Sequence, residues 1–259
     1  MMWNFFIGYA LLTMFCWLLS AYFVFYKKKE TLAAVFAFIG LCVLGVFIVK
    51  LWLALERPPL RTMGETRLWY AFFLAALGIF ASYRWKYSWL MTVSCFIAAI
   101  FLIIDIVKPE LHSKTLMPAL QSYWFIPHVT VYIFSYALLG VSCLCAFKLI
   151  YQSHNNIEDK ELFKFTDNVV YVGLGFLLLG LLFGAFWAKE AWGHYWAWDP
   201  KETWAFITVA GYLIYIHMRL QKNTSQLAFY VLPLAFILLM ITWLGVSYLP
   251  TAPMSVHTY

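Results

Sequence analysis

The chain has 259 residues, of which 64% are hydrophobic and only 12% are charged. A soluble domain carries about 25% charged residues, so this composition excludes a water-soluble globule as well as a disordered or collagen-like chain. The mean hydropathy of +0.78 is typical of a protein embedded in a lipid bilayer. The net charge of +6 comes without a basic stretch long enough for nucleic acid, and we therefore expect no nucleic-acid partner.

The N-terminal sequence predicts a retained first helix. MMWNFF carries no positively charged n-region, and no small-residue cleavage site precedes the lysines at 27–29. The five cysteines form no CxxC pair and lie within apolar stretches, so we interpret them as small buried residues and expect neither disulfides nor a thiolate metal site.

Apolar stretches separated by short polar segments predict an all-α fold, a polytopic membrane bundle of about eight transmembrane helices. We expect these helices to form a single transmembrane domain over residues 1–259, because no large soluble domain fits between them. In the sixth stretch, Gly180 and Gly184 have the small-xxx-small spacing that is typical of close helix packing. The expected spans are 3–26, 32–54, 68–83, 88–107, 128–150, 169–187, 204–220 and 228–249.

The basic residues predict the orientation of the bundle. Three consecutive lysines at 27–29 follow an uncharged N-terminus, which favours an outer N-terminus, and eight spans return the C-terminus to the same side. We expect the outer face to be the periplasmic face of the cell inner (cytoplasmic) membrane. It then holds residues 56–67, 108–127, 188–203 and the tail from 250.

The most informative stretch is the segment 188–204, which ends in WGHYWAWDPKETW and holds four of the 13 tryptophans. Anchoring at a membrane interface needs only one or two of them. Gly193 weakens a helix here, and Trp198 falls off the helix face that Trp192 and Trp196 could share. We therefore expect an irregular or shallow surface that presents several indoles to a large, flat aromatic ligand. A dense aromatic belt at the interface is the alternative interpretation.

The residues after Trp198 predict the start of a helix. Asp199 suits the N-cap, Pro200 the first helical position and Glu202 the third, which together form a capping box. Such a start would hold the tryptophans against a helix N-terminus, where Lys201 could meet an anionic group such as a carboxylate.

The run WGHYWAWDPKET resembles the WGxxWxWDxxxT signature, or WWD domain, of the haem-handling proteins that assemble c-type cytochromes. Its flanks resemble the CcsA (ResC) branch of that superfamily. Residues 65–70 (ETRLWY) are similar to its outer-loop acidic segment, His128-Val129 to its HV at the start of a span, and LGVSYL followed by His257–Tyr259 to its GVN…HSY ending, although this chain reads VHTY. The CcmC and CcmF branches share the tryptophan signature.

The resemblance implies that His128 and His257 are axial ligands of the iron of haem b at the outer face. Both lie at the outer ends of predicted spans, and imidazole is a common ligand of haem iron. A single histidine at the boundary of a span is more often an interfacial residue, but two beside a tryptophan surface favour ligation. The same site would include Trp192, Gly193, Trp196, Trp198, Asp199, Pro200, Lys201 and Glu202.

His217 follows Asp199 by 18 residues, which is about 27 Å along a helix that rises 1.5 Å per residue. An ionisable group that deep in a bilayer is a functional hypothesis by default, while a histidine that snorkels near Arg219 is the alternative. The resemblance implies that His217 ligates a transmembrane haem whose second histidine comes from a partner of the CcsB (ResB) type. We interpret His112, His154 and His194 as residues that do not ligate iron, although His194 lies at a variable position of the tryptophan motif and could line the site.

Arg57, Arg61 and Arg67 form a positive cluster on the expected outer loop, where positive charge is disfavoured. They could neutralise haem propionates. A structural role, in which they pair with Glu56 and Glu65, is equally consistent with the sequence.

The resemblance implies a function in haem handling or export and in the attachment of haem to the CxxCH thiols of apocytochrome c. The chain would then be a subunit of a System II cytochrome c synthase, a haem lyase that works with the CcsB-type partner. Two alternatives stay open: a haem delivery protein of the CcmC type without attachment activity, and a transporter of another aromatic or quinone-like substrate. The sequence assigns no catalytic side chain.

Overall fold

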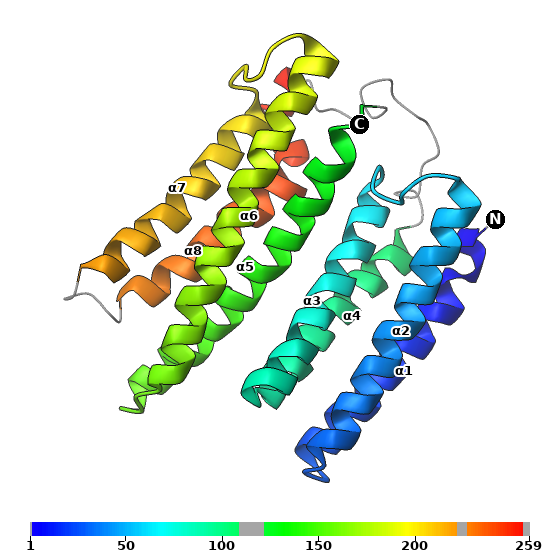
Figure 1. The fold of residues 1–259 in the computed structure, drawn as a ribbon, viewed down its shortest axis with the longest axis vertical. Helices are drawn as coiled ribbons and strands as arrows, with labels where there is room; N and C mark the ends of the chain where they lie inside the picture. Colours follow the sequence, from blue (N-terminus) through cyan, green and yellow to red (C-terminus); the bar gives the residue numbers. More distant parts are fainter. Residues whose placement is uncertain (1, 109–121, 222–226, 256–259) are drawn as a thin grey trace. The chain divides into compact units, whose positions relative to one another are not determined.

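The computed structural model describes residues 2–108, 122–221 and 227–255. Within these ranges the regular structure is helical, and no residue lies in a β-strand. The chain divides into two compact units, residues 1–115 and 116–259, whose helices can be followed in Figure 1. The predicted all-α class is confirmed, while the single haem-handling domain expected over residues 1–259 stays a prediction.

The first unit is an antiparallel arrangement of four helices. Short turns join α1 (Phe6–Phe25), α2 (Glu30–Leu55), α3 (Met63–Trp85) and α4 (Ser88–Val107). Helix α1 packs against α2 and α4, and α3 packs against the same two helices, so the four surround a common core. Small residues allow close approach in this unit: the indole of Trp17 lies over Gly40, and Ser94 lies against Gly78.

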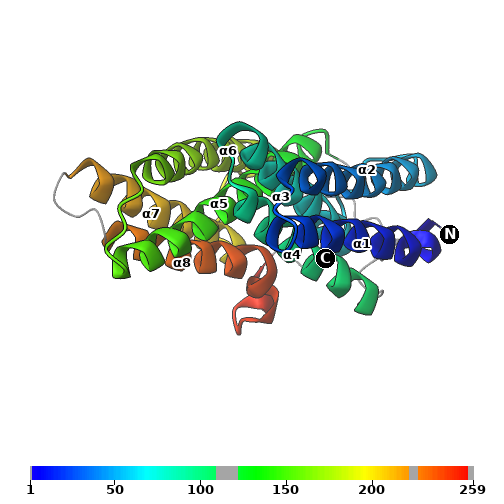
Figure 2. The same ribbon diagram turned by 90° about the horizontal axis from the view of Figure 1, so that it is seen from below.

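The second unit repeats this order of contacts. It contains α5 (Phe125–His154), α6 (Lys160–Trp192), α7 (Pro200–Leu220) and α8 (Leu227–Met240), with α5 against α6 and α8, and α7 against the same two. Figure 2 shows α5–α8 from below, with α8 beside α5. The chain continues beyond α8 through a π-helical turn, Ile241–Gly245, and two 3₁₀ turns.

This antiparallel order gives the second unit two distinct ends. The starts of α5 and α7 and the ends of α6 and α8 lie together at one end. This end carries residues 188–204, the tryptophan segment. The end of α7, which carries His217, lies at the opposite end with the start of α6.

Seven helical segments of the described residues are long and apolar enough to cross a membrane: α1 to α6 and the segment from α8 through Tyr248. Their outward side chains include many large apolar ones, such as Leu18 and Leu53, as expected for surfaces that face lipid. A polytopic membrane bundle is therefore confirmed. The expected span 204–220 forms α7, which is not among the seven; its first turn carries Glu202, and its last carries His217 and Arg219. The orientation of the termini stays a prediction.

Candidate functional site

The tryptophan segment leaves the helix at Trp192. Gly193 follows in the left-handed conformation, with φ of 87°, and ends α6 because a residue without Cβ adopts this geometry at little cost. Residues 194–199 are non-helical until α7 begins at Pro200. The expected irregular surface is therefore present: Trp198 is 64% exposed, Trp192 and Trp196 are half-buried, and the rings of Trp196 and Trp198 meet edge to face at 5.7 Å.

The predicted capping box at the start of α7 is confirmed. The buried carboxylate of Asp199 accepts from the backbone N–H of Lys201 at 2.7 Å. Oε2 of Glu202 accepts from the backbone N–H of Asp199 at 3.2 Å and from that of Ala197 at 2.7 Å. Glu202 thus fixes the backbone of the non-helical residues around Trp196 and Trp198 as well as the start of α7. Burial lowers the pKa of the Lys201 amine, and the neighbouring Asp199 carboxylate opposes that shift.

His128 lies in the first turn of α5 and is half-buried against α6. Its Nδ1 is 2.8 Å from the carbonyl oxygen of Gly180. Because a carbonyl only accepts, Nδ1 carries the proton, and the lone pair of a neutral imidazole is then on Nε2. A histidine that ligates a metal commonly has this arrangement, with its other nitrogen donating to a backbone carbonyl.

Trp187 connects His128 with the tryptophan segment. It is 2% exposed and stacks on the His128 ring with centroids 5.4 Å apart and planes at 28°. Trp187 also contacts Trp192, edge to face at 4.9 Å. The structure therefore brings the predicted ligand and the predicted surface together through a residue that the motif does not include. Its spacing from Gly180 and Gly184 on one face of α6 is the signal that could have revealed it.

His217, in the last turn of α7, has a different environment. It is exposed, and its Nδ1 is 2.8 Å from the carbonyl oxygen of Leu213 in its own helix, which again leaves the lone pair on Nε2. His154, at the end of α5, makes the same kind of contact with Ile150 and is exposed.

An ion pair fixes the helix end that carries His217. Arg219 donates to both carboxylate oxygens of Asp167 in α6, at 2.9 Å and 2.7 Å, and the hydroxyl of Tyr215 donates to the same carboxylate at 2.6 Å. The guanidinium also lies over the rings of Phe163 and Phe229. Sequence reasoning identified Arg219 only as a neighbour of His217, because the partner carboxylate lies 52 residues away.

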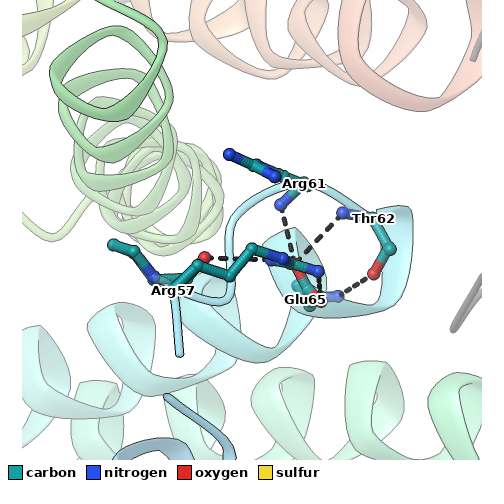
Figure 3. Close-up of polar contacts among 5 residues, drawn as sticks. Arg57, Arg61, Thr62 and Glu65 are labelled. Atoms are coloured by element: carbon teal, nitrogen blue, oxygen red, sulfur yellow. Dashed lines mark hydrogen bonds and ion pairs between the residues drawn. The ribbon is translucent and has the colours of Figure 1, made fainter. Parts of the chain in front are cut away.

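The three arginines belong to the first unit, and each makes different contacts. Figure 3 shows Arg57 and Arg61 around Glu65. Arg57 pairs with both carboxylate oxygens of Glu65, at 3.0 Å and 2.9 Å, as one interpretation expected. Arg67 is buried and pairs not with Glu56 or Glu65 but with Asp105 in α4, with Nε 2.8 Å from Oδ1. Asp105 was missed by sequence reasoning, although a single carboxylate in an apolar run indicates a buried partner.

Arg61 is the exception in this cluster. Its backbone N–H donates to Glu65 at 2.7 Å, but among the described residues no carboxylate pairs with its guanidinium. The side chain points away from Glu65 in Figure 3. Burial and the adjacent Arg57 charge lower the pKa of this guanidinium.

Of the other histidines, His194 is exposed within the tryptophan segment. His112 and the predicted ligand His257 lie outside the described residues.

Fold and site together define a polytopic helical membrane protein with a tryptophan-rich segment beside an oriented histidine. Residues 60–252 match the family described as cytochrome C assembly protein. The chain therefore belongs to the cytochrome c assembly protein family, which confirms the resemblance seen in its motifs and gives it a role in cytochrome c biogenesis.

Among similar proteins is the cytochrome c biogenesis protein CcsA of Chlorella vulgaris, 33% identical over 254 residues that cover 81% of each chain. The CcsA protein of Lactuca sativa is 30% identical over 274 residues, 85% of this chain and 82% of that protein. The CcsA protein of Chlamydomonas reinhardtii is 38% identical over 156 residues, 57% of this chain and 44% of that protein.

Proposed function

We propose that this protein binds haem and attaches it to apocytochrome c, as the haem-handling subunit of a System II cytochrome c synthase. The observation that carries the proposal is His128, whose Nδ1 donates to Gly180 and whose ring stacks on Trp187 beside the tryptophan segment. Family membership supports the wider role in cytochrome c biogenesis.

In this proposal His128 offers Nε2 to the haem iron, and His257 supplies the second axial ligand. The porphyrin face lies against the exposed indole of Trp198 and its neighbours, where aromatic stacking and burial supply much of the binding energy. Lys201, at the N-terminus of α7, is suited to a haem propionate.

The chemistry of attachment belongs to the haem vinyl groups and the reduced CxxCH thiols, since each thiol adds across a vinyl double bond to form a thioether. The protein contributes by holding the ring where the thiols can reach it. This step needs no oxidant, and no side chain of the chain takes part in the new bonds.

His217 serves a second, intramembrane haem in this proposal, with a histidine of a CcsB-type partner as the other ligand. Its exposed ring, with the proton on Nδ1, and the Asp167–Arg219 ion pair at the same end of α7 support this assignment. Haem would enter from the inner side or the bilayer, bind first at His217, and then reach the periplasmic site at His128.

The test is co-expression with a CcsB-type partner and an apocytochrome c in a host that lacks its own maturation system. His128→Ala, His257→Ala and His217→Ala are each expected to lower the haem content of the purified complex, change its absorption spectrum and reduce covalent haem on the cytochrome. His154→Ala is the matched control, because His154 is exposed and bonded to its own helix as His217 is. Unchanged haem binding in the three variants would contradict the ligand assignment.

The same experiment separates the alternative functions. Haem that co-purifies without any covalent product would favour a delivery protein of the CcmC type. Absence of haem from the wild-type complex would favour a transporter of another aromatic substrate.

A further inference from the structure

We propose that Gly180, Gly184 and Trp187 form an imidazole cradle on α6 that orients His128 before haem arrives. The inference rests on the proposed function, since orientation matters most if His128 is an iron ligand. The cradle residues are spaced four and three apart and therefore lie on one face of α6, the face that packs against α5.

The glycines are needed because two rings of α5 occupy the space that their side chains would take. A Cβ on Gly184 would lie 2.7 Å from Cε1 and 2.8 Å from Nδ1 of His128. A Cβ on Gly180 would lie 2.7 Å from the ring of Tyr132, one turn along α5. The small-xxx-small spacing thus does more than bring two backbones together: it accommodates the rings of His128 and Tyr132.

The backbone of the cradle also selects the tautomer. The Gly180 carbonyl oxygen accepts from Nδ1–H at 2.8 Å, and a carbonyl oxygen has a second lone pair that can serve the helix at the same time. This hydrogen bond holds the proton on Nδ1, so that Nε2 carries the lone pair, and it sets the direction in which Nε2 points.

Trp187 completes the cradle by fixing the plane of the ring. The indole is buried and stacks on the imidazole, while Tyr132 meets the same ring edge to face with centroids 4.6 Å apart. With position, tautomer and plane all set by the apoprotein, the imidazole loses little rotamer freedom when it takes a ligand.

The test compares Gly184→Ala with Gly175→Ala in the complex with the CcsB-type partner. Both changes add a methyl group and raise helix propensity within α6, but only the first crowds His128, since nothing lies within 4 Å of a Cβ on Gly175. Haem is titrated into the apo-complex and followed by its Soret band. We expect Gly184→Ala to weaken binding by about 10- to 100-fold, as for other residues that orient a metal ligand, and Gly175→Ala to leave it unchanged.

A double variant separates an action through His128 from general packing. In a His128→Ala background the Gly184 methyl group has no imidazole to displace, so Gly184→Ala is expected to cause no further loss of haem affinity. Equal losses in both backgrounds, or equal behaviour of Gly184→Ala and Gly175→Ala, would overturn the cradle.

The ¹⁵N resonances of His128 provide a readout without haem. The wild type is expected to show the Nδ1–H tautomer, and Gly184→Ala to lose it; an unchanged spectrum would overturn the cradle. If His128→Ala alone leaves haem binding intact while the tautomer result holds, the proposed function fails and the cradle stands.

Should Gly184→Ala unfold, Trp187→Phe tests the same point, because phenylalanine keeps a ring beside His128. We expect Trp187→Phe to weaken haem binding when His128 is present and to have no effect in the His128→Ala background. An equal effect in both backgrounds would contradict the proposal.

Discussion

The loop before α3 and the tryptophan segment before α7 share one local structure, a capping box, but differ in what surrounds it. Each precedes the third helix of its unit, and each has a capping box, Thr62 with Glu65 and Asp199 with Glu202. In both, the glutamate accepts from a backbone N–H outside the helix at 2.7 Å. The surroundings of the two glutamates differ.

Glu65 is 1% exposed and binds Arg57 through both oxygens, while Arg67, two residues on, pairs with buried Asp105. Among the described residues Glu202 takes part in no ion pair, and the segment it holds leaves Trp198 exposed. The loop before α3 is held by an ion pair as well as by its capping box. The tryptophan segment is held by the Glu202 carboxylate, and Trp198 stays exposed. A capping box therefore fixes where a helix begins, and its neighbours decide whether the loop serves stability or binding.

The largest effect is expected for Arg67→Met, because it leaves the fully buried Asp105 carboxylate without its cation. Breaking a buried ion pair on one side costs about 3–5 kcal/mol. Unfolding by SDS titration in mixed micelles measures the loss. The double variant Arg67→Met/Asp105→Leu should recover most of it, and no recovery would show that the arginine stabilises by packing alone.

The glutamates of the two capping boxes provide the next comparison. Glutamine can still accept from the backbone, so Glu65→Gln chiefly removes the charge that faces Arg57. We expect the free energy of unfolding to fall by about 1.5–3 kcal/mol. Glu202→Gln should cost about 1 kcal/mol or less, since it keeps a neutral acceptor for Ala197 and Asp199. The same SDS titration applies to both variants. Equal losses would remove the distinction between the two loops.

Trp198 separates stability from binding within the tryptophan segment. It has φ of 56°, a conformation that costs a residue with a side chain about 1–2 kcal/mol. Trp198→Gly should therefore be about 1 kcal/mol more stable than Trp198→Ala, while both weaken haem binding, by about 10-fold if one aromatic contact is lost. Haem titration and SDS titration of the same samples test this. Normal haem affinity in both variants would exclude the indole from the site.

The smallest change in stability is expected for Arg61→Gln, within about 0.5 kcal/mol, because its guanidinium has no carboxylate partner among the described residues. If Arg61 meets a haem propionate, the variant should still bind haem more weakly than wild type in the same titration. Arg57→Gln, whose partner is Glu65, should show the reverse order, with a larger loss of stability than of affinity.

Hydropathy located the helices better than it located their ends. The sixth stretch was expected at 169–187, but α6 extends from Lys160 to Trp192, because Asp159 caps a polar first turn and Gly193 ends the helix past the apolar part. Hydropathy detects only the residues that contact lipid or core, so polar turns at a helix end escape it. Caps depend on adjacent residues, which is why the start of α7 could be predicted to the residue.

The amino-acid sequence by itself determined the class of the protein, the approximate helices, the capped tryptophan segment and the candidate histidines, because each depends on composition or on residues close together in the chain. Tertiary structure decided what those residues contact. It paired Arg67 with Asp105 and Arg219 with Asp167. It also placed His128 in a hydrogen bond with the Gly180 carbonyl and in a stack with Trp187. The three hydrogen-bonded pairs among these contacts join residues 38 to 52 positions apart, and the packing of one helix face against another selects them.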